Sequence, residues 1–182
     1  PLPLKPRARL YRDGIDVLIP SVRRVPPEAV SPRAKSHNYL NLILADMEAK
    51  SQDPESWAIL LDTRGFLAEG IGSNIFTIKD GVIYTPQEQY VLGGISRETA
   101  IEMAEKIDVP VVTKDIDLFD AMTADEIFLT STSLCICGVR SFQGRKIGDG
   151  LAAGPITKAL MDAYVDFVDF DWVAQYLTRL ED

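Results

Sequence analysis

The chain has 182 residues, and 19 Lys and Arg against 27 Asp and Glu give it a formal net charge of −8. Its apolar fraction of 46% argues against a disordered chain and is enough for the core of one domain. The acidic balance argues against nucleic-acid binding, and no apolar run is long enough to cross a membrane. Two cysteines cannot form a disulfide framework. We therefore expect a protein of the reducing cytoplasm, with neither nucleic acid nor membrane as a partner.

The first 14 residues contain three prolines within the first six positions, followed by mixed charge. This pattern is typical of a linker or an extended arm rather than the first element of a compact fold. We therefore expect an arm over residues 1–14 and a globular domain over residues 15–182.

Along the rest of the chain, short apolar runs alternate with turn signals and amphipathic stretches. Strands are predicted over 15–19, 57–62, 73–78, 82–84, 109–113, 126–129 and 134–140. Lys-Asp-Gly at 79–81 indicates a hairpin turn. Helices are predicted over 38–50, 96–107, 117–122 and 155–168. Hairpins and scattered helices, without regular βαβ alternation, favour a sheet-rich, mixed α/β (α+β) fold.

The helix predicted over 38–50 carries four apolar side chains at helical spacing. These are Leu40, Ile43, Leu44 and Met47. Lys35 stands just before this helix, and a lysine near packed surface can become a nucleophile towards carbonyl groups. A solvated lysine near a helix end is the ordinary alternative.

Glu69 is followed by glycines, Ser73 and Asn74, between two expected strands. Such a carboxylate could lie against a ligand, although Gly, Ser and Asn also favour an ordinary turn. Gly93-Gly94-Ile95-Ser96 leads into a helix, whose free amides favour an anion, unless Ser96 is only the N-cap. A second hydroxyl cluster, at residues 130–133, follows the strand predicted over 126–129.

The remaining candidates point to packing rather than chemistry. His37 is the only histidine, and no G-x-S-x-G motif supplies a nucleophilic serine for a triad. Clustered metal ligands are absent from the sequence, so we expect no metal site. Cys135 and Cys137 would face one side of a strand, as small packing residues.

Taken in order, these segments resemble the large domain of the fold-type IV pyridoxal-phosphate enzymes, the class IV aminotransferases. This family includes branched-chain and D-amino-acid aminotransferases, (R)-selective amine transaminases and aminodeoxychorismate lyase. The matching stretches are RAKSHNYLNLILADMEA, LDTRGFLAEGIGSNIFTIKDGVIYTP, VLGGISRETAIEMA, ADEIFLTSTSLCICGV and GPITKALMDAY. They follow the family order and cover nearly the whole chain beyond residue 14.

The resemblance implies the D-amino-acid aminotransferase-like fold, the cofactor pyridoxal 5′-phosphate and a homodimer. It implies that Lys35 forms a Schiff base with the cofactor aldehyde and later moves the substrate proton. Glu69 would meet the pyridine nitrogen, and Tyr39 the ring hydroxyl. The phosphate would be bound by Ile95, Ser96 and Thr132, and the substrate carboxylate would lie beside Ser133 and Leu134.

Two departures from the family pattern follow from the same resemblance. Nothing here matches the N-terminal small domain, so residues 1–14 would be the interdomain linker, and we expect weak activity or none from these 182 residues alone. Cys135-Ile136-Cys137-Gly138 stands where many relatives carry an acidic residue and a Thr-Pro pair, next to the expected substrate region.

The function implied is transfer of an amino group between an amino acid and a 2-oxo acid such as 2-oxoglutarate. GIDVLIPSVRR and EGIGSNIF look most like the branched-chain branch. The alternatives are a D-amino-acid or (R)-amine transaminase, an aminodeoxychorismate-type lyase on the same fold, and an inactive truncated domain.

Overall fold

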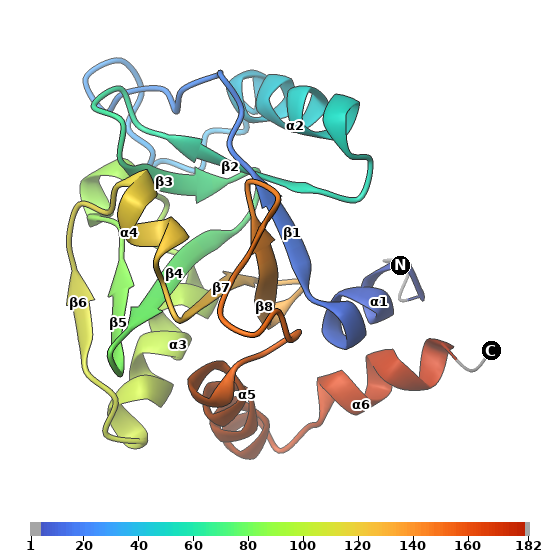
Figure 1. Cartoon of the computed structure of the whole chain (residues 1–182). Coiled ribbons are helices and arrows are strands. Elements are labelled where there is room, and N and C mark those ends of the chain that lie inside the picture. The colour runs from blue at the N-terminus through green and yellow to red at the C-terminus, as the bar shows by residue number, and fades with distance from the viewer. Residues whose placement is uncertain (1–4, 181–182) are drawn as a thin grey trace.

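The computed structural model describes residues 5–180 as one nine-stranded sheet with helices packed around it (Figure 1). The strands are β1 (Ile15–Leu18), β2 (Trp57–Leu61), β3 (Leu67–Gly70), β4 (Asn74–Lys79), β5 (Val82–Thr85), β6 (Val111–Thr113), β7 (Glu126–Ser131), β8 (Cys135–Phe142) and β9 (Arg145–Lys146). The α-helices are α1 (Lys5–Asp13), α2 (Leu40–Gln52), α3 (Ile95–Lys106), α4 (Leu118–Met122), α5 (Pro155–Val168) and α6 (Trp172–Leu177). Two short 3₁₀ helices, η1 (Glu88–Tyr90) and η2 (Thr178–Leu180), complete the described elements.

The sheet closes on itself. Its strand order is β3-β2-β1-β8-β7-β4-β5-β6, and β3 also pairs with β4 through Glu69 and Asn74. The first six strands of this order therefore form a closed ring, from which β5 and β6 extend. Closure leaves few free strand edges, and it fixes which residues stand side by side around the ring.

The central strands are buried on both faces because helices cover the outside of this ring. In β2, Ile59 and Leu61 belong to the main core, whereas Ala58 and Leu60 pack against α2. In β7, Phe128 faces α3 and α5, while its neighbours Ile127 and Leu129 face the main core. Continuous apolar runs, rather than alternation, are the expected signature of such strands.

Helices α3 and α5 pack together over one side of β7 and β8. The start of α5 is fixed by a buried carboxylate, since Glu126 accepts hydrogen bonds from the amides of Ile156 and Thr157 at 2.9 and 2.8 Å. A carboxylate at a helix N-terminus is favoured by both the free amides and the helix dipole. Helix α5 runs over 155–168, as the sequence predicts.

Helix α2 buries a different face from the one its apolar stripe suggests. Three buried residues of α2 pack on β2, and two of them are alanines. They are Leu42, Ala45 and Ala49. The stripe of Leu40, Ile43, Leu44 and Met47 is exposed, by 64, 44, 48 and 63%. An amphipathic helix normally turns such a stripe to the core. Here the stripe faces outward, and the face with two alanines packs on the sheet.

The expectation of an extended arm is wrong for residues 5–13. They form α1, in which Ala8 and Tyr11 are buried in the main core. The Tyr11 ring stacks on Tyr176 of α6, with 5.0 Å between centroids, so α1 and α6 lie side by side near the two ends of the chain (Figure 1). Residues 1–4 lie outside the described part, and the interdomain role stays a prediction.

The sheet-rich, mixed α/β class is confirmed, whereas some elements differ from the prediction. Strand β3 and helix α6 were not expected, and Glu69 lies within β3 rather than in a turn. Cys135 and Cys137 are free thiols packed against the main core. Within the described residues, no helix is both long and apolar enough to span a membrane.

Candidate active site

One cavity gathers six of the eight residues that the sequence singles out. Its lining includes Lys35, Tyr39, Glu69, Ile95, Ser96 and Thr132. These come from four separate regions of the chain, namely the loop before α2, the strand β3, the start of α3 and the residue after β7. Glu69 is the one acidic side chain among the described lining residues, and it faces a cavity that also contains Arg24 and Lys35.

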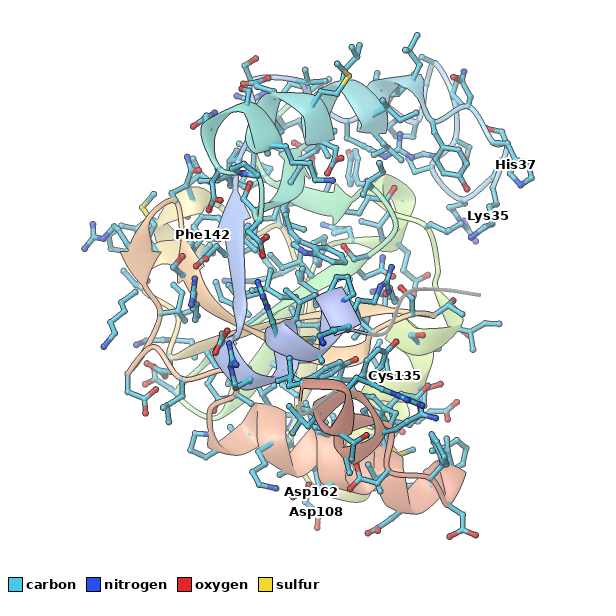
Figure 2. All side chains as sticks on the ribbon, turned by 90° about the vertical axis from the view of Figure 1, so that its right-hand side faces the viewer. Lys35, His37, Asp108, Cys135, Phe142 and Asp162 are labelled. Atoms are coloured by element: carbon cyan, nitrogen blue, oxygen red, sulfur yellow. The ribbon has the colours of Figure 1, made fainter. Side chains whose placement is uncertain are left out.

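Lys35 lies in the long connection between β1 and α2, on an exposed turn at the edge of the molecule (Figure 2). The turn is held by its own backbone, with the Ser36 amide donating to the Ala34 carbonyl at 2.8 Å. His37 adopts a left-handed backbone conformation, and its ring stacks on Tyr39 at 6.0 Å. Tyr39 is the N-cap residue, directly before the first residue of α2. The loop therefore brings the amine and the phenol to the same cavity.

Glu69 is 5% exposed and has both carboxylate oxygens occupied. One accepts from the Arg24 Nε at 2.8 Å, and the other accepts from the Leu92 amide at 2.9 Å. Burial raises the pKa of Glu69, while the Leu92 amide, Arg24 and the Lys35 charge act in the opposite direction. Burial is the largest effect, so the pKa of Glu69 stays above its ordinary value, and the hydrogen bonds and charges around it offset part of the cost of ionising a buried carboxylate.

The closed ring sets the spacing within the cavity. Glu69 on β3 pairs with Asn74 on β4, and Asn74 pairs with Thr130 on β7. Neighbouring strands are separated by about 4.8 Å, so the backbones at Glu69 and Thr130 are about 10 Å apart across two strand spacings. This span is suited to a ligand that has an aromatic ring and a phosphate group. The ring nitrogen would contact the acid at one end, and the phosphate would lie at the other end.

The far end of the cavity is suited to an anion. Helix α3 begins at Ile95 after Gly94, and no side chain caps its first amides. Ser96 therefore lies inside the first turn, and the alternative in which it is the N-cap is wrong. A Cβ at position 94 would lie 2.6 Å from the Asn74 Oδ1, so a larger residue here would displace the Asn74 side chain. Free amides at a helix N-terminus favour phosphate.

Two buried hydroxyls support the same interpretation. Ser73 Oγ and Thr130 Oγ1 line the cavity region and have no hydrogen-bond partner among the described groups. Unpaired buried polar atoms cost free energy, and at ligand sites their partners are often supplied by the ligand. The donors, acceptors and amine present here therefore fit a phosphorylated pyridine aldehyde.

Ser133 and Leu134 do not line this cavity. Leu134 is fully buried in the main core, and its amide donates to Ser131 Oγ at 3.1 Å. The Ser133 carbonyl accepts from the Tyr176 hydroxyl at 3.0 Å. Their expected place beside a substrate carboxylate stays a prediction that this arrangement does not support.

Sequence reasoning missed Arg24 and Leu92, the two groups that bind Glu69. Arg24 lies 45 positions and Leu92 23 positions from Glu69. The one available signal was the segment of residues 21–25, which lies between two prolines and contains two arginines. No spacing rule connects that segment with a carboxylate so distant in the chain.

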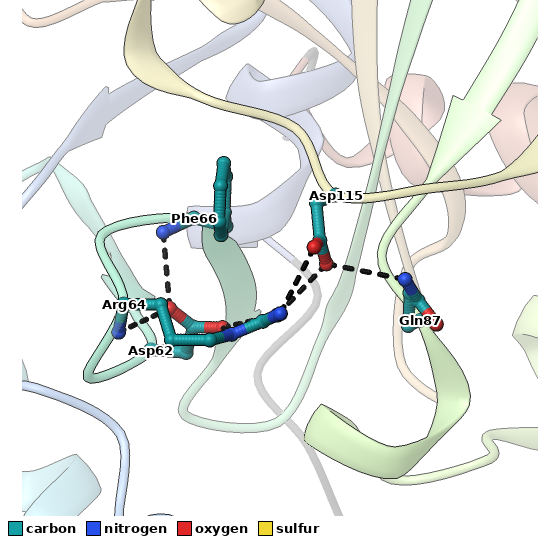
Figure 3. A network of polar contacts seen from close by, with 5 residues as sticks. All are labelled: Asp62, Arg64, Phe66, Gln87 and Asp115. Atoms are coloured by element: carbon teal, nitrogen blue, oxygen red, sulfur yellow. Dashed lines mark hydrogen bonds and ion pairs between the residues drawn. The ribbon is translucent and has the colours of Figure 1, made fainter.

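A polar network fixes the segment that leads to Leu92. Arg64 pairs with Asp62 and Asp115, each at 2.8 Å (Figure 3). Its guanidinium also lies 4.0 Å from the centroid of the Tyr90 ring. Tyr90 ends η1, two residues before the amide that binds Glu69. The network thus links the turn after β2 with the wall of the cavity.

Comparison with known proteins identifies the family. The family model described as amino-transferase class IV matches residues 2–142. A branched-chain-amino-acid aminotransferase of Pseudomonas aeruginosa is 42% identical over 158 residues, which are 86% of this chain and 51% of that protein. The enzyme of the same name from Escherichia coli K12 is 34% identical over 159 residues, again 86% of this chain and 51% of the relative.

Solved structures show the same fold. The branched-chain amino acid aminotransferase of Escherichia coli superimposes with a TM-score of 0.82 at 32% identity, covering 88% of this chain and 53% of that one. A T.th. branched-chain amino acid aminotransferase with pyridoxamine 5′-phosphate gives the same TM-score of 0.82 at 34% identity, over 87% of this chain and 52% of that one. The chain thus spans about half the length of the relatives it matches. Both the sequence match and the shared fold lead to one conclusion, that the chain belongs to the class IV aminotransferase family.

Proposed function

We propose that this chain forms the cofactor-binding part of a pyridoxal 5′-phosphate-dependent transaminase. The observation that carries the proposal is the meeting of Lys35, Glu69 and the α3 amides at one cavity. The reaction moves an amino group between a branched-chain amino acid and a 2-oxo acid such as 2-oxoglutarate. The substrate class is supported by the two branched-chain-amino-acid aminotransferases that are 34 and 42% identical to this chain, each about twice as long as the matched region.

When bound, the cofactor supplies an electron sink for the substrate carbon next to the amine. The residues of this chain would bind and orient it. Glu69 would hold a proton on the ring nitrogen, Tyr39 would bond the ring hydroxyl, and Ile95, Ser96 and Thr132 would bind the phosphate. Lys35 would attach to the aldehyde, and once released it would move the proton at the substrate carbon.

Covalent trapping tests the role of Lys35. Pyridoxal 5′-phosphate is added to the protein, the visible absorbance is recorded, and the sample is reduced with borohydride. We expect the cofactor mass on the peptide that contains Lys35, and no visible band with Lys35→Ala. Lys50→Ala is the matched control, because Lys50 is also an exposed lysine but lies in the last turn of α2 and pairs with Asp46 at 2.7 Å. Labelling at another lysine, with none at Lys35, would contradict the proposal.

An assay with and without 2-oxoglutarate tests the reaction class. A transaminase consumes the amino donor only when an acceptor is present, whereas a lyase needs none. Branched-chain L-amino acids are compared with D-amino acids and (R)-amines as donors. We expect turnover by these 182 residues to be weak, and to rise when the polypeptide that corresponds to the other half of the relatives is joined to them.

The partner and the compartment complete the proposal. We propose a homodimer, supported by the exposed stripe of α2, which offers apolar surface that a second copy could cover. We also propose the cytoplasm, supported by the two free thiols at positions 135 and 137.

A further inference from the structure

Arg24 is the charged side chain in direct contact with Glu69. Its Nε donates to Glu69 Oε1 at 2.8 Å, and the two side chains are only 13 and 7% exposed. Within such a buried site, a hydrogen bond between ions is shorter and stronger than a neutral one. Losing one partner of a buried ion pair leaves the other charge uncompensated.

The backbone around Arg24 is fixed independently of its side chain. The Arg24 amide donates to the Leu61 carbonyl at the end of β2, at 2.8 Å. On either side, Asn41 of α2 donates to the Arg23 carbonyl at 2.7 Å and accepts from the Val25 amide at 3.2 Å. The segment is thus held between the sheet and α2, and a change of the Arg24 side chain alone leaves these bonds in place.

We propose that Arg24 is a positioning residue that keeps the Glu69 carboxylate ionised and aimed into the cavity, so that a bound pyridine nitrogen retains its proton. The inference rests on the proposed function. Glu69 and the ring nitrogen would share one proton, and its place depends on which group is the stronger base. A guanidinium in direct contact with Glu69, and farther from the ring, makes the carboxylate the weaker base.

The other two groups that act on Glu69 do not supply a permanent positive charge beside it. Lys35 is the second cation that acts on Glu69, but it is the amine that we propose to react with the aldehyde. The Leu92 amide donates one neutral hydrogen bond, at 2.9 Å. Arg24 is therefore the cation that remains against the carboxylate once a cofactor is bound.

The test uses the full chain loaded with pyridoxal 5′-phosphate that carries ¹⁵N in its ring. The ¹⁵N chemical shift reports directly whether the ring nitrogen is protonated. We expect a protonated ring in the wild type and a largely unprotonated ring in Arg24→Met, together with about tenfold or more weaker cofactor binding. Arg24→Lys restores the charge, and we expect it to restore the proton. Arg23→Met is the matched control, since Arg23 is adjacent and exposed and does not line the cavity.

The outcomes separate this inference from the proposed function. If the wild type fails to bind the cofactor, both the proposed function and the inference about Arg24 are wrong. If Arg24→Met binds the cofactor and keeps the ring protonated, only the inference is overturned. If Arg24→Met does not fold, Arg24→Gln, which retains a donor but no charge, takes its place with the same expected loss.

Discussion

Glycine at position 138 is required by close packing of the chain against strand β8. A Cβ there would collide with the carbonyl oxygen of Ala152, in the segment that leads to α5. This backbone atom cannot turn away as a flexible side chain could. The close approach explains why a small residue lies at the centre of a strand, a position where glycine is otherwise unfavourable.

We expect Gly138→Ala to lower the free energy of unfolding by about 1–3 kcal/mol, because the segment of Ala152 must shift. Urea unfolding followed by circular dichroism measures this loss. Gly72→Ala is the control, since a Cβ at position 72 meets nothing within 4 Å. Equal stability of the two variants would show that the segment of Ala152 can shift without loss of free energy of unfolding.

The individual site residues were predictable to different degrees. Lys35 and Glu69 stand out because reactive side chains next to a helix start or to glycines are visible in the sequence, and both line the cavity. Ser133 and Leu134 were placed by resemblance alone, and they lie outside it. Arg24 was missed because its importance comes from one long-range contact with Glu69.

At the scale of elements, Asp16 joins β1 to β8. Its carboxylate accepts from Arg140 Nε at 2.9 Å and from the Ser141 hydroxyl, beside a shift of register between Ile15 and Asp16. The hydrogen bond from Arg140 is the main cause that lowers the pKa of Asp16 below its ordinary value of 3.8, against the effect of burial. The ionised form is therefore the one that stabilises this pair of strands.

The pH dependence follows from the sign of that shift. The stabilisation is complete above the ordinary pKa and is lost as pH falls through the lowered one. We expect Asp16→Asn to cost about 1–2 kcal/mol at neutral pH, and the cost to vanish in strong acid. Thermal unfolding of both proteins across this range measures it.

Asp162→Asn is the control for this pair. Asp162 forms an exposed pair with Lys158 at 2.7 Å, one turn apart on α5. Exposed pairs of this kind contribute about 0.5 kcal/mol or less. A cost for Asp16→Asn that persists unchanged in acid would show that Asp16 acts through packing instead of charge.

Local signals predicted some elements well. Pro155 at the first position of α5 and the Lys-Asp-Gly turn between β4 and β5 fix their elements by backbone geometry, and both appear as expected. For α2, helical periodicity gave the element but not its orientation. The stripe of large side chains faces outward. Which face of a helix is buried depends on the element that packs against it, and periodicity in the sequence does not reveal that element.

For the whole molecule, the exposed α2 stripe makes the proposed dimer testable. We expect Leu40→Lys combined with Met47→Lys to shift the protein from dimer to monomer in sedimentation velocity, since charges there oppose burial. Phe119→Lys is the control, because Phe119 is a 73% exposed apolar residue elsewhere on the surface. A wild-type monomer, or a double variant that remains dimeric, would contradict this use of the stripe.

Local pattern in the sequence by itself determined the sheet-rich class and most strands. Resemblance of several segments in order indicated the family, and with it the lysine and glutamate that we propose for the site. Tertiary structure alone decided the closure of the ring through β3 and β4, the packing of α1 against α6, and the contact of Arg24 with Glu69. The physical reason is distance along the chain. Hydrogen bonds and packing between segments tens of residues apart arise only when the whole fold brings them together, and they leave no local periodicity to read.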